Sequence, residues 1–445
     1  MFKTLKNAWK TPEVRKKILY TLLLIAIFRL GCFIVVPGVD SIAISEQMKT
    51  ATGSLAGLID TISGGAFSKL SILAMSVTPY ITASIVIQLL GMIIPSLEKL
   101  IKEGGEMGKA KVNMYTKLIA LLLSFVEGLG LYIMYSTSYT GIFVEQGFLT
   151  GLIVVLSLMT GTAILMWLGE EMTNKGIGNG VSMIIFIGII SGLPSGIVTL
   201  WNLIVTEAGI STAGIVTSII VIIGAILLVA GVVFVQEAER KVPVQYAKKV
   251  VGRKMYGGQN THIPLKLAMA GVMPVIFASS FMTFPAMMIQ IFAADKIGGT
   301  GFLAGLYEFS IATSTSNVAW GYSLANAIVY LLLIVGFTFF YTYATFNPAE
   351  VATNIKQNGG FIPGIRPGKP TAEYLKKISG RVTLFGALFL SVIAIVPSLL
   401  FKSIGGTLVG AFSATGLLIV VSVALEFNQQ LEAQIMMKQY KGFLK

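Results

Sequence analysis

Long apolar runs separated by short polar segments repeat from one end of the chain to the other. At least nine of these runs approach or exceed the roughly 18 residues that an α-helix needs to cross a bilayer. The pattern predicts an all-α polytopic membrane protein with ten transmembrane helices. The spans are expected near residues 18–36, 73–94, 116–136, 150–168, 181–201, 213–235, 268–293, 321–343, 381–401 and 405–425. The seventh run contains Pro274 and Pro285, so a kink is expected at one of them.

A different pattern precedes the second span. Residues 53–70, GSLAGLIDTISGGAFSKL, are too apolar for an ordinary surface loop, yet too short and interrupted to cross a bilayer. The apolar side chains cluster ahead of Gly64 and Gly65, which predicts a short re-entrant helix with a hinge at the glycines. A re-entrant segment without a gating role is the alternative.

Composition supports a membrane protein. Of the 445 residues, 55% are hydrophobic and 12% are charged, and the mean hydropathy is +0.81. A soluble domain would carry about twice that share of charge. The start, MFKTLKNAWKTPEVRKK, lacks a small-residue cleavage site after a short apolar core, so no cleavable signal peptide is predicted. The single cysteine, Cys32, falls in the first span and is expected to be a small buried hydrophobe.

Lys and Arg are distributed very unevenly among the connections. The N-tail, the connections after even-numbered spans and the C-tail carry 28 of the 33, whereas the other connections carry four. Because cytoplasmic loops are enriched in Lys and Arg, both termini are expected to be cytoplasmic.

Ten spans divide into two halves of five, so the second half starts on the opposite side of the membrane from the first. This is the arrangement of two pseudo-symmetric inverted halves. No internal sequence match proves it, and ten spans without symmetry remain an alternative. The expected units are a cytoplasmic N-tail (1–17), an N-terminal half (18–205, with the re-entrant helix at about 53–68), a C-terminal half (206–425, with cytoplasmic loops 236–266 and 344–380) and a cytoplasmic C-tail (426–445).

Ionisable residues inside the spans are scarce. Charge inside a membrane is costly and persists only for function or pairing. Arg29 lies about 18 Å along the first span, where snorkelling or capping of carbonyl groups is favoured over contact with a substrate. Glu127, in LSFVEGLG, has no Lys or His partner for a proton relay. This scarcity of ionisable residues inside the spans argues against a solute transporter.

Enzyme chemistry is not indicated either. The only histidine, His262, lies in a basic loop, and no metal cluster, Ser/His pair or paired intramembrane carboxylates can be assembled. The stretch GIGNG (176–180) lacks the preceding strand of a dinucleotide site and is expected to be a tight turn. The sequence also lacks a GxxxxGK[ST] motif for ATP. No enzyme activity, metal or cofactor is therefore expected.

Several long motifs resemble those of the SecY translocon channel family, in the same order along the chain. They are KLSILAMSVTPYITASIVIQLL (69–90), WLGEEMTNKGIGNGVSMIIF (167–186), ERKVPVQYAKKVVGRK (239–254), MAGVMPVIFASSFMTFP (269–285), FIPGIRPGKPT (361–371) and TGLLIVV (415–421). The resemblance extends from the N-tail to the C-tail and points to the bacterial branch. It implies ten spans in two halves of five, in agreement with the topology derived from hydropathy and charge.

The resemblance also implies an hourglass channel, constricted by a ring of aliphatic side chains and closed from outside by the re-entrant helix, the plug. The ring falls on Val77, Ile81, Ile185, Ile189, Ile276 and Ile419. The plug residues are Leu55, Leu58, Ile59, Asp60, Ile62, Gly64, Gly65 and Phe67. Two pairs in the ring are spaced i, i+4 and share a helix face. Spacing alone would not select these six residues.

By the same resemblance, the channel opens sideways, between spans two and three on one side and seven and eight on the other. The candidate polar groups at this lateral gate are Thr82, Gln88, Glu127, Ser279 and Ser280. Close helix contact through small residues is the alternative role for the serines. Phe284 stands where some relatives carry a polar residue, which weakens the expectation of a polar cluster at the gate.

The basic cytoplasmic loops are expected to receive partners. Their candidate residues are Arg240, Lys241, Lys248, Lys249, Arg253, Lys254 and Arg366. Such residues set topology and meet anionic lipid headgroups, but loops of about 30 residues are longer than topology requires. The resemblance implies docking of the SecA motor and of the ribosome. Basic residues bind ribosomal RNA with an affinity that falls as the salt concentration rises. The resemblance also implies assembly with SecE and SecG. Arg366, in GIRPG, is the leading candidate for coupling to the motor.

The favoured function is a protein-conducting channel of the bacterial cytoplasmic (inner) membrane. It would pass unfolded secretory polypeptides across the membrane and release transmembrane segments laterally into it, driven by SecA or by the translating ribosome. The alternative is a secondary transporter of a small solute with inverted repeats. A transporter should show paired acids and bases inside its spans, whereas Arg29 and Glu127 stand apart.

Overall fold

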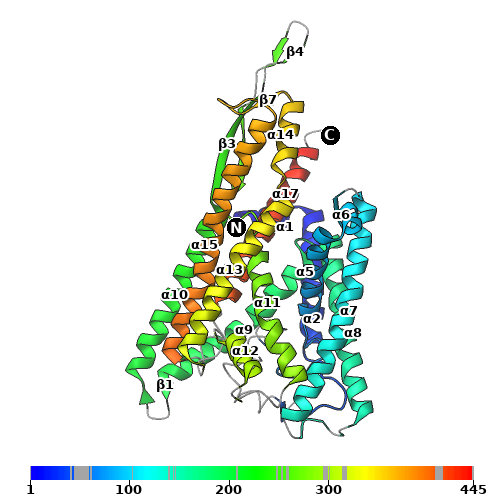
Figure 1. Cartoon of the computed structure of the whole chain (residues 1–445), viewed down its shortest axis with the longest axis vertical. Helices are drawn as coiled ribbons and strands as arrows, with labels where there is room; N and C mark the ends of the chain where they lie inside the picture. Colours follow the sequence, from blue (N-terminus) through cyan, green and yellow to red (C-terminus); the bar gives the residue numbers. More distant parts are fainter. Residues whose placement is uncertain are drawn as a thin grey trace.

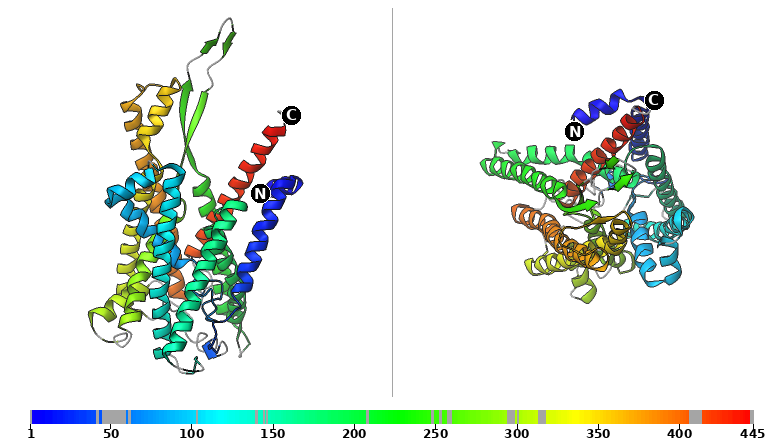
Figure 2. Two further views of the ribbon diagram at one scale, coloured as in Figure 1. Left: turned by 90° about the vertical axis from the view of Figure 1, so that its right-hand side faces the viewer. Right: turned by 90° about the horizontal axis from the view of Figure 1, so that it is seen from above.

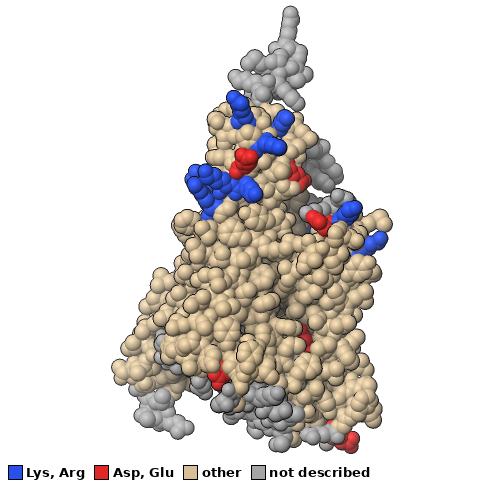
Figure 3. Space-filling model, viewed as in Figure 1, with Lys and Arg blue, Asp and Glu red and all other residues tan. Residues whose placement is uncertain are grey.

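The computed structural model describes residues 2–40, 43–44, 60, 63–102, 104–138, 141–143, 145, 147–206, 209–246, 249–251, 254–256, 260–293, 299, 301–312, 318–405 and 414–442. In this part of the chain, long α-helices run along one axis and form the body, and a β-hairpin projects from one end (Figure 1). On the face shown in Figure 3, Lys and Arg gather at the hairpin end, above a broad band that is nearly free of charge. This surface is that of a protein embedded in a membrane.

One long helix overlaps each predicted span, although the helix of the first span ends at Gly31 and not at the predicted residue 36. These helices are α2 (Pro12–Gly31), α5 (Thr78–Ile93), α7 (Gly105–Ser138), α8 (Phe148–Lys175), α9 (Gly180–Ile204), α10 (Thr212–Glu237), α11 (Met273–Phe292), α13 (Trp320–Thr345), α15 (Lys369–Gly405) and α17 (Ala414–Gly442). Within the described part of the chain, six helices are long and apolar enough to cross a membrane. The number is seven if α5 and α6 (Pro95–Lys102) form one span bent by 111°. The all-α membrane architecture is confirmed, and the count of ten spans remains a prediction.

Prolines set the first residues of two helices. The second span was expected from residue 73, but residues 72–77 form successive turns and α5 begins at Thr78, with Pro79 in its first turn. Likewise, Pro274 lies in the first turn of α11 and starts the helix instead of kinking it. Proline is favoured there because its missing N–H would have no intrahelical partner.

Several helices extend beyond their apolar parts. Helix α15 begins at Lys369, well before the predicted residue 381, and α17 continues to Gly442, well past residue 425. The charged first turns of α15 pack against α14 (Pro348–Gln357). Hydropathy locates only the membrane part of such a helix, so the polar extensions were missed.

The two basic loops form one small sheet. Strand β3 (Glu239–Tyr246) pairs with β6 (Asn260–Lys266) as an antiparallel hairpin, and β7 (Gly360–Phe361) pairs with the other edge of β3. The sheet packs against α14 and α15 through an apolar core. Its buried members are Val242, Val244, Leu265, Ile355, Ile362 and Leu375. The segments predicted as separate loops, 236–266 and 344–380, are therefore joined into a single folded unit.

Shorter elements complete the described chain. They are α1 (Phe2–Lys10), α12 (Phe302–Ile311), β1 (Val205–Thr206) paired with β2 (Gly209–Ile210), and β4 (Lys249–Val251) paired with β5 (Lys254–Tyr256). The β1–β2 pair joins α9 to α10, where the two predicted halves meet. The tight turn predicted at residues 176–180 is confirmed, and Asn179 caps α9 by accepting from the N–H groups of Val181 and Ser182.

The largest apolar core lies between the two halves. Viewed along the long axis, α2, α7 and α8 lie on one side and α10, α13 and α15 on the other (Figure 2). Buried residues from both sides form one cluster, including Phe28 of α2, Ile184 of α9 and Leu390 of α15.

Candidate functional site

Helices from both halves bring the six ring residues together. Val77 directly precedes α5, Ile81 lies in its first turn, Ile185 and Ile189 lie in α9, Ile276 in α11 and Ile419 in α17. Five of the six are buried members of the largest apolar cluster, and Ile81 packs against it. Residues that are far apart in the sequence thus contribute to one apolar cluster.

The predicted ring residues other than Ile81 are buried in this structure. Val77 is 1% exposed, Ile185 and Ile189 are 4% exposed, and Ile276 is 9% exposed. These side chains carry no hydrogen-bonding group, so water between them would lack the two to four polar partners that hold buried water. An apolar constriction of this kind excludes water and ions.

Part of the predicted plug lies outside the described residues, namely Leu55, Leu58, Ile59 and Ile62. The end that is described forms a tight turn held by its own polar groups. The N–H of Ser68 donates to Asp60 Oδ1 at 2.7 Å, and the N–H of Phe67 donates to Ser63 Oγ at 3.1 Å. Burial raises the pKa of the Asp60 carboxyl, and the hydrogen bond from Ser68 opposes that rise. The two hydrogen bonds therefore hold the turn together.

The same end of the predicted plug packs into the core. Phe67 is 2% exposed, and its ring centroid lies 6.0 Å from that of Tyr135 on α7. Ala66 belongs to the same apolar cluster as the ring. Gly64 and Gly65 have φ angles of 69° and 81°, a conformation that favours glycine. The glycine turn therefore adjoins the cluster that contains the ring.

Arg29 fastens this glycine turn to α2 and α9. Its Nη1 donates to the carbonyl oxygen of Gly64 and to Ser191 Oγ, both at 2.9 Å. Ser191 Oγ in turn donates to the carbonyl oxygen of Gly188 at 2.6 Å. The expected capping of a carbonyl group by Arg29 is confirmed, but nothing in the sequence indicated that the carbonyl would be that of Gly64, in the predicted plug. We call these two hydrogen bonds of Arg29 the Arg29 latch.

The two sides of the predicted lateral gate are in contact. Helix α11 packs against both α5 and α7. Glu127, on α7, is buried at 5% exposure. Aromatic pairs join α11 to α13: the ring centroid of Phe277 lies 6.0 Å from that of Phe337 and 6.1 Å from that of Tyr341. Each such pair stabilises the contact between α11 and α13 by about 0.5–1.5 kcal/mol beyond its buried area.

Polar side chains predicted for this gate bond to their own helices. Thr82 Oγ1 donates to the carbonyl oxygen of Thr78 at 3.1 Å, and Gln88 Nε2 donates to Ser84 Oγ at 3.3 Å. Ser279 Oγ donates to the carbonyl oxygen of Ile276 at 2.9 Å. Ser280 is half-buried on α11, next to Ser279. These hydrogen bonds of Thr82, Gln88 and Ser279 do not tie the two sides of the gate together.

Basic residues of the predicted docking loops lie on the projecting hairpin. Arg240 and Lys241 are exposed on β3, and Lys241 Nζ lies 3.2 Å from Glu239 Oε1. Lys249 belongs to β4 and Lys254 to β5, with side chains outside the described part, and Lys248 and Arg253 lie outside it entirely. The structure therefore places the described cations of loop 236–266 at the charged end of the protein.

Arg366 lies on the turn between β7 and α15. Its side chain is exposed, and its carbonyl oxygen accepts from Thr371 Oγ1 at 2.9 Å. Gly364 and Gly368 flank it with φ angles of 81° and 108°. Ile362, at the start of the turn, is 2% exposed in the sheet core. A turn fixed at both ends thus presents the Arg366 guanidinium to solvent.

Comparisons with known sequences match the whole chain. The family model SecY matches residues 71–428. The protein translocase subunit SecY of Streptomyces scabiei is 42% identical over the full length of both chains. The protein of the same name from Thermus thermophilus is 41% identical over 100% of this chain and 98% of its own length.

Solved structures share the arrangement of helices at lower identity. The structure described as that of a protein conducting channel has a TM-score of 0.67 and 20% identity, covering 94% of this chain and 91% of that chain. The channel of a canine ribosome–channel complex from the endoplasmic reticulum has a TM-score of 0.63 and 18% identity, with the same coverage. The fold is therefore that of these channels.

Proposed function

The chain belongs to the SecY family and is a protein-conducting translocation channel of the bacterial membrane, and from this premise we propose which residues form the channel and which receive its partners. The constriction is the ring of Val77, Ile81, Ile185, Ile189, Ile276 and Ile419. One observation supports this proposal: five of the six residues belong to a single apolar cluster built from helices of both predicted halves, and Ile81 packs against it.

An aliphatic ring suits a channel that passes many different sequences. It resists water and ions when closed, because an apolar constriction dewets. It also offers a passing chain no directional hydrogen bond, so it neither selects nor retains one class of side chain. The channel is passive and has no ATP site of its own, and an external motor or the ribosome moves the chain.

The plug closes the ring from the external side, and the Arg29 latch holds the plug in place. The lateral gate lies between α5 and α7 on one side and α11 and α13 on the other. Apolar packing contributes to the contact between its two sides, and this packing can be exchanged for contacts with lipid or with a hydrophobic segment. Signal sequences and transmembrane segments leave the channel there.

The hairpin end faces the cytoplasm, together with both termini. The uneven distribution of Lys and Arg supports this orientation. SecA and the ribosome dock on the β3–β6 hairpin and on the turn of Arg366, and SecE and SecG complete the complex. Similar structures include the canine ribosome–channel complex and a yeast Ssh1 complex bound to the 80S ribosome, which supports the ribosome as a partner.

A secretory chain arrested in transit is expected to cross-link to a photoreactive residue placed at Ile276 or at Ile81. The matched control is the same residue at Phe385, which is 72% exposed on the outer face of α15. The measurement is the yield of cross-linked product in membranes energised for transport. Equal yields at all three positions, or a product at Phe385 alone, would show that the chain passes outside the ring.

Charge reversal at Arg366 (Arg366→Glu) is expected to lower SecA-driven transport about fivefold, the effect of losing about 1 kcal/mol at an interface. Ribosome binding should change less than twofold, because many cations share the contact with RNA. The measurement is translocation of a secretory precursor into vesicles, and Lys369→Glu, an exposed residue at the start of α15, is the control. Normal transport together with loss of ribosome binding would refute the assignment of Arg366 to the motor.

A further inference from the structure

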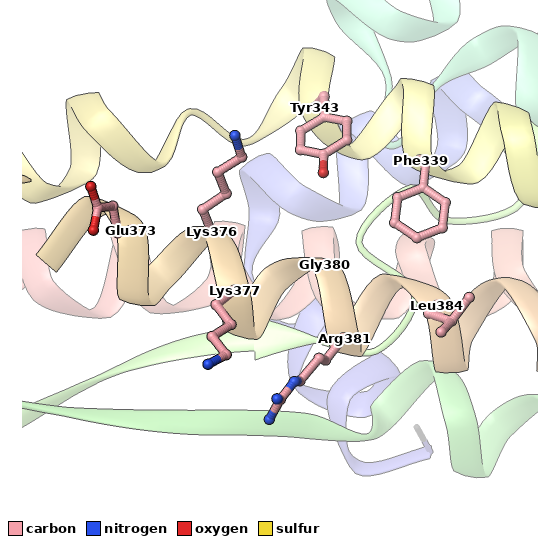
Figure 4. Close-up of a pocket in the computed structure, with 8 residues that line it drawn as sticks. All are labelled: Phe339, Tyr343, Glu373, Lys376, Lys377, Gly380, Arg381 and Leu384. Carbon is pink, nitrogen blue, oxygen red and sulfur yellow. The ribbon is translucent and has the colours of Figure 1, made fainter. Parts of the chain in front are cut away.

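A shallow groove of about 450 Å³ runs over α15 where this helix passes the end of α13. Its lining residues are Phe339 and Tyr343 of α13 and Glu373, Lys376, Lys377, Gly380, Arg381 and Leu384 of α15. The α15 residues recur at intervals of three and four, so they form one stripe of the helix. In Figure 4, Lys376 extends toward the side of Tyr343, while Lys377 and Arg381 extend on the opposite flank of α15. We call this feature the α13–α15 groove.

The groove carries an excess of positive charge. Three cations and one acid line it, and Glu373 lies at the end farthest from Leu384 (Figure 4). Lys376, Lys377 and Arg381 are all exposed. None of the three belongs to an ion pair within the part of the chain that the structure describes. An anion in the groove would therefore meet cations that no acid has neutralised.

The groove lies where the surface of α15 changes from charged to apolar. Arg381 marks the start of the predicted ninth span. Beyond it, the exposed side chains of α15 are apolar over several turns: Leu384, Phe385, Leu388, Val392 and Val396 are 44–72% exposed. A charged stripe that continues into an exposed apolar stripe matches a molecule with an anionic head and an apolar tail, and not a soluble anion.

The wall and the floor of the groove suit such a head. Phe339 and Tyr343 are stacked on α13, with ring centroids 6.3 Å apart, and aromatic residues are enriched at the level of lipid headgroups. Gly380 forms the floor, where an added Cβ would meet no heavy atom within 4 Å. The volume lies within the range of small-molecule sites, about 300–1,000 Å³.

We propose that the α13–α15 groove binds the headgroup of an anionic phospholipid. The phosphodiester lies over Gly380 between Lys376, Lys377 and Arg381, and an acyl chain follows the exposed apolar stripe of α15. Basic pockets between transmembrane helices recognise anionic headgroups by this combination of charge and depth. Ribosomal RNA is the less suitable occupant, because it offers nothing to the apolar stripe.

The test is native mass spectrometry of the full-length protein in detergent, titrated with phosphatidylglycerol. The charge variant Lys376→Gln/Lys377→Gln/Arg381→Gln is expected to bind about tenfold more weakly than the wild type. The matched control is Lys10→Gln/Lys356→Gln/Lys369→Gln, which removes three exposed cations that do not line the groove. This control is expected to stay within twofold of the wild type.

A second variant tests shape without changing charge. Gly380→Leu fills the floor of the groove, and it should fold because the space is open and leucine favours the helix over glycine. It is expected to weaken phosphatidylglycerol binding several-fold. Phosphatidylcholine and the chainless headgroup glycerophosphoglycerol are expected to bind the wild type more weakly than phosphatidylglycerol.

Four results would overturn the proposal. Equal losses in the charge variant and in its control would mean diffuse attraction to the charged end of the protein. Unchanged binding by Gly380→Leu would place the lipid elsewhere. Glycerophosphoglycerol binding as tightly as the intact lipid would define a site for free anions. Loss of ribosome binding by the charge variant, with unchanged lipid affinity, would assign these cations to RNA.

Discussion

Replacing Ile276 by asparagine is expected to raise the ion conductance of the resting channel by as much as about a hundredfold. Ile276 is 9% exposed and belongs to the same apolar cluster as Val77, Ile185, Ile189 and Ile419 of the proposed ring. A buried amide without a partner costs about 1–3 kcal/mol. Water that enters the ring would remove this cost, so asparagine favours the hydrated, conducting state by up to that amount. Each 1.4 kcal/mol changes the population of that state about tenfold. The same change should admit precursors with defective signal sequences.

The measurement is the conductance of the purified protein in planar bilayers. Ile393→Asn is the control, because Ile393 is similarly buried in the same apolar cluster, on α15, but does not belong to the ring. Both variants lose stability, and only Ile276→Asn should leak. Conductance and signal-sequence selectivity that match the wild type, or equal leaks in both variants, would remove Ile276 from the constriction.

The helices could be located from the sequence, but their ends could not. A membrane-spanning helix must satisfy its backbone internally and present apolar side chains to lipid, so its apolar part is visible in any sequence. Its continuation into water depends on tertiary contacts. Helix α15 continues back to Lys369 because α14 and the sheet pack against it. No local pattern at residues 369–380 reports those neighbours.

Strands in the basic loops were missed for a related reason. The burial of β3 alternates only over Val242 and Val244, within a stretch whose charges suggested a solvated loop. The sheet also requires β7, which lies more than a hundred residues further along the chain. Pairing over that separation is a property of the fold and not of a window of sequence.

The ring and the Arg29 latch show two further limits of prediction from the sequence. Aliphatic residues occur throughout the spans, so only the resemblance to the SecY family singled out the six, and the fold then placed them in one cluster. For Arg29 the chemistry was predictable, because an intramembrane cation must find acceptors. Its acceptors were not, since Gly64 and Ser191 lie 35 and 162 residues away.

Removing the latch with Arg29→Met is expected to raise the resting conductance about a hundredfold. Arg29 makes two hydrogen bonds, at 2.9 Å each, from a charged group. Bonds of that kind contribute about 1.5–3 kcal/mol each. Even at the lower value, two of them shift the equilibrium between the closed and the released plug about a hundredfold. Methionine keeps the apolar stem but cannot donate, so the plug is released more often. Ser191→Ala removes one bond and should have a smaller effect.

Two controls separate the latch from nearby charge and from backbone strain. Lys69→Met removes another cation near the plug, whose Nζ lies over the Phe33 ring, and it should not leak. Gly64→Ala and Gly65→Ala both place a side chain at positive φ, but only at Gly64 would the new Cβ lie 2.6 Å from Arg29 Nη1. Gly64→Ala should therefore leak more than Gly65→Ala and add little to Arg29→Met. Equal leaks in the two glycine variants would mean that the glycine backbone, and not Arg29, holds the plug closed.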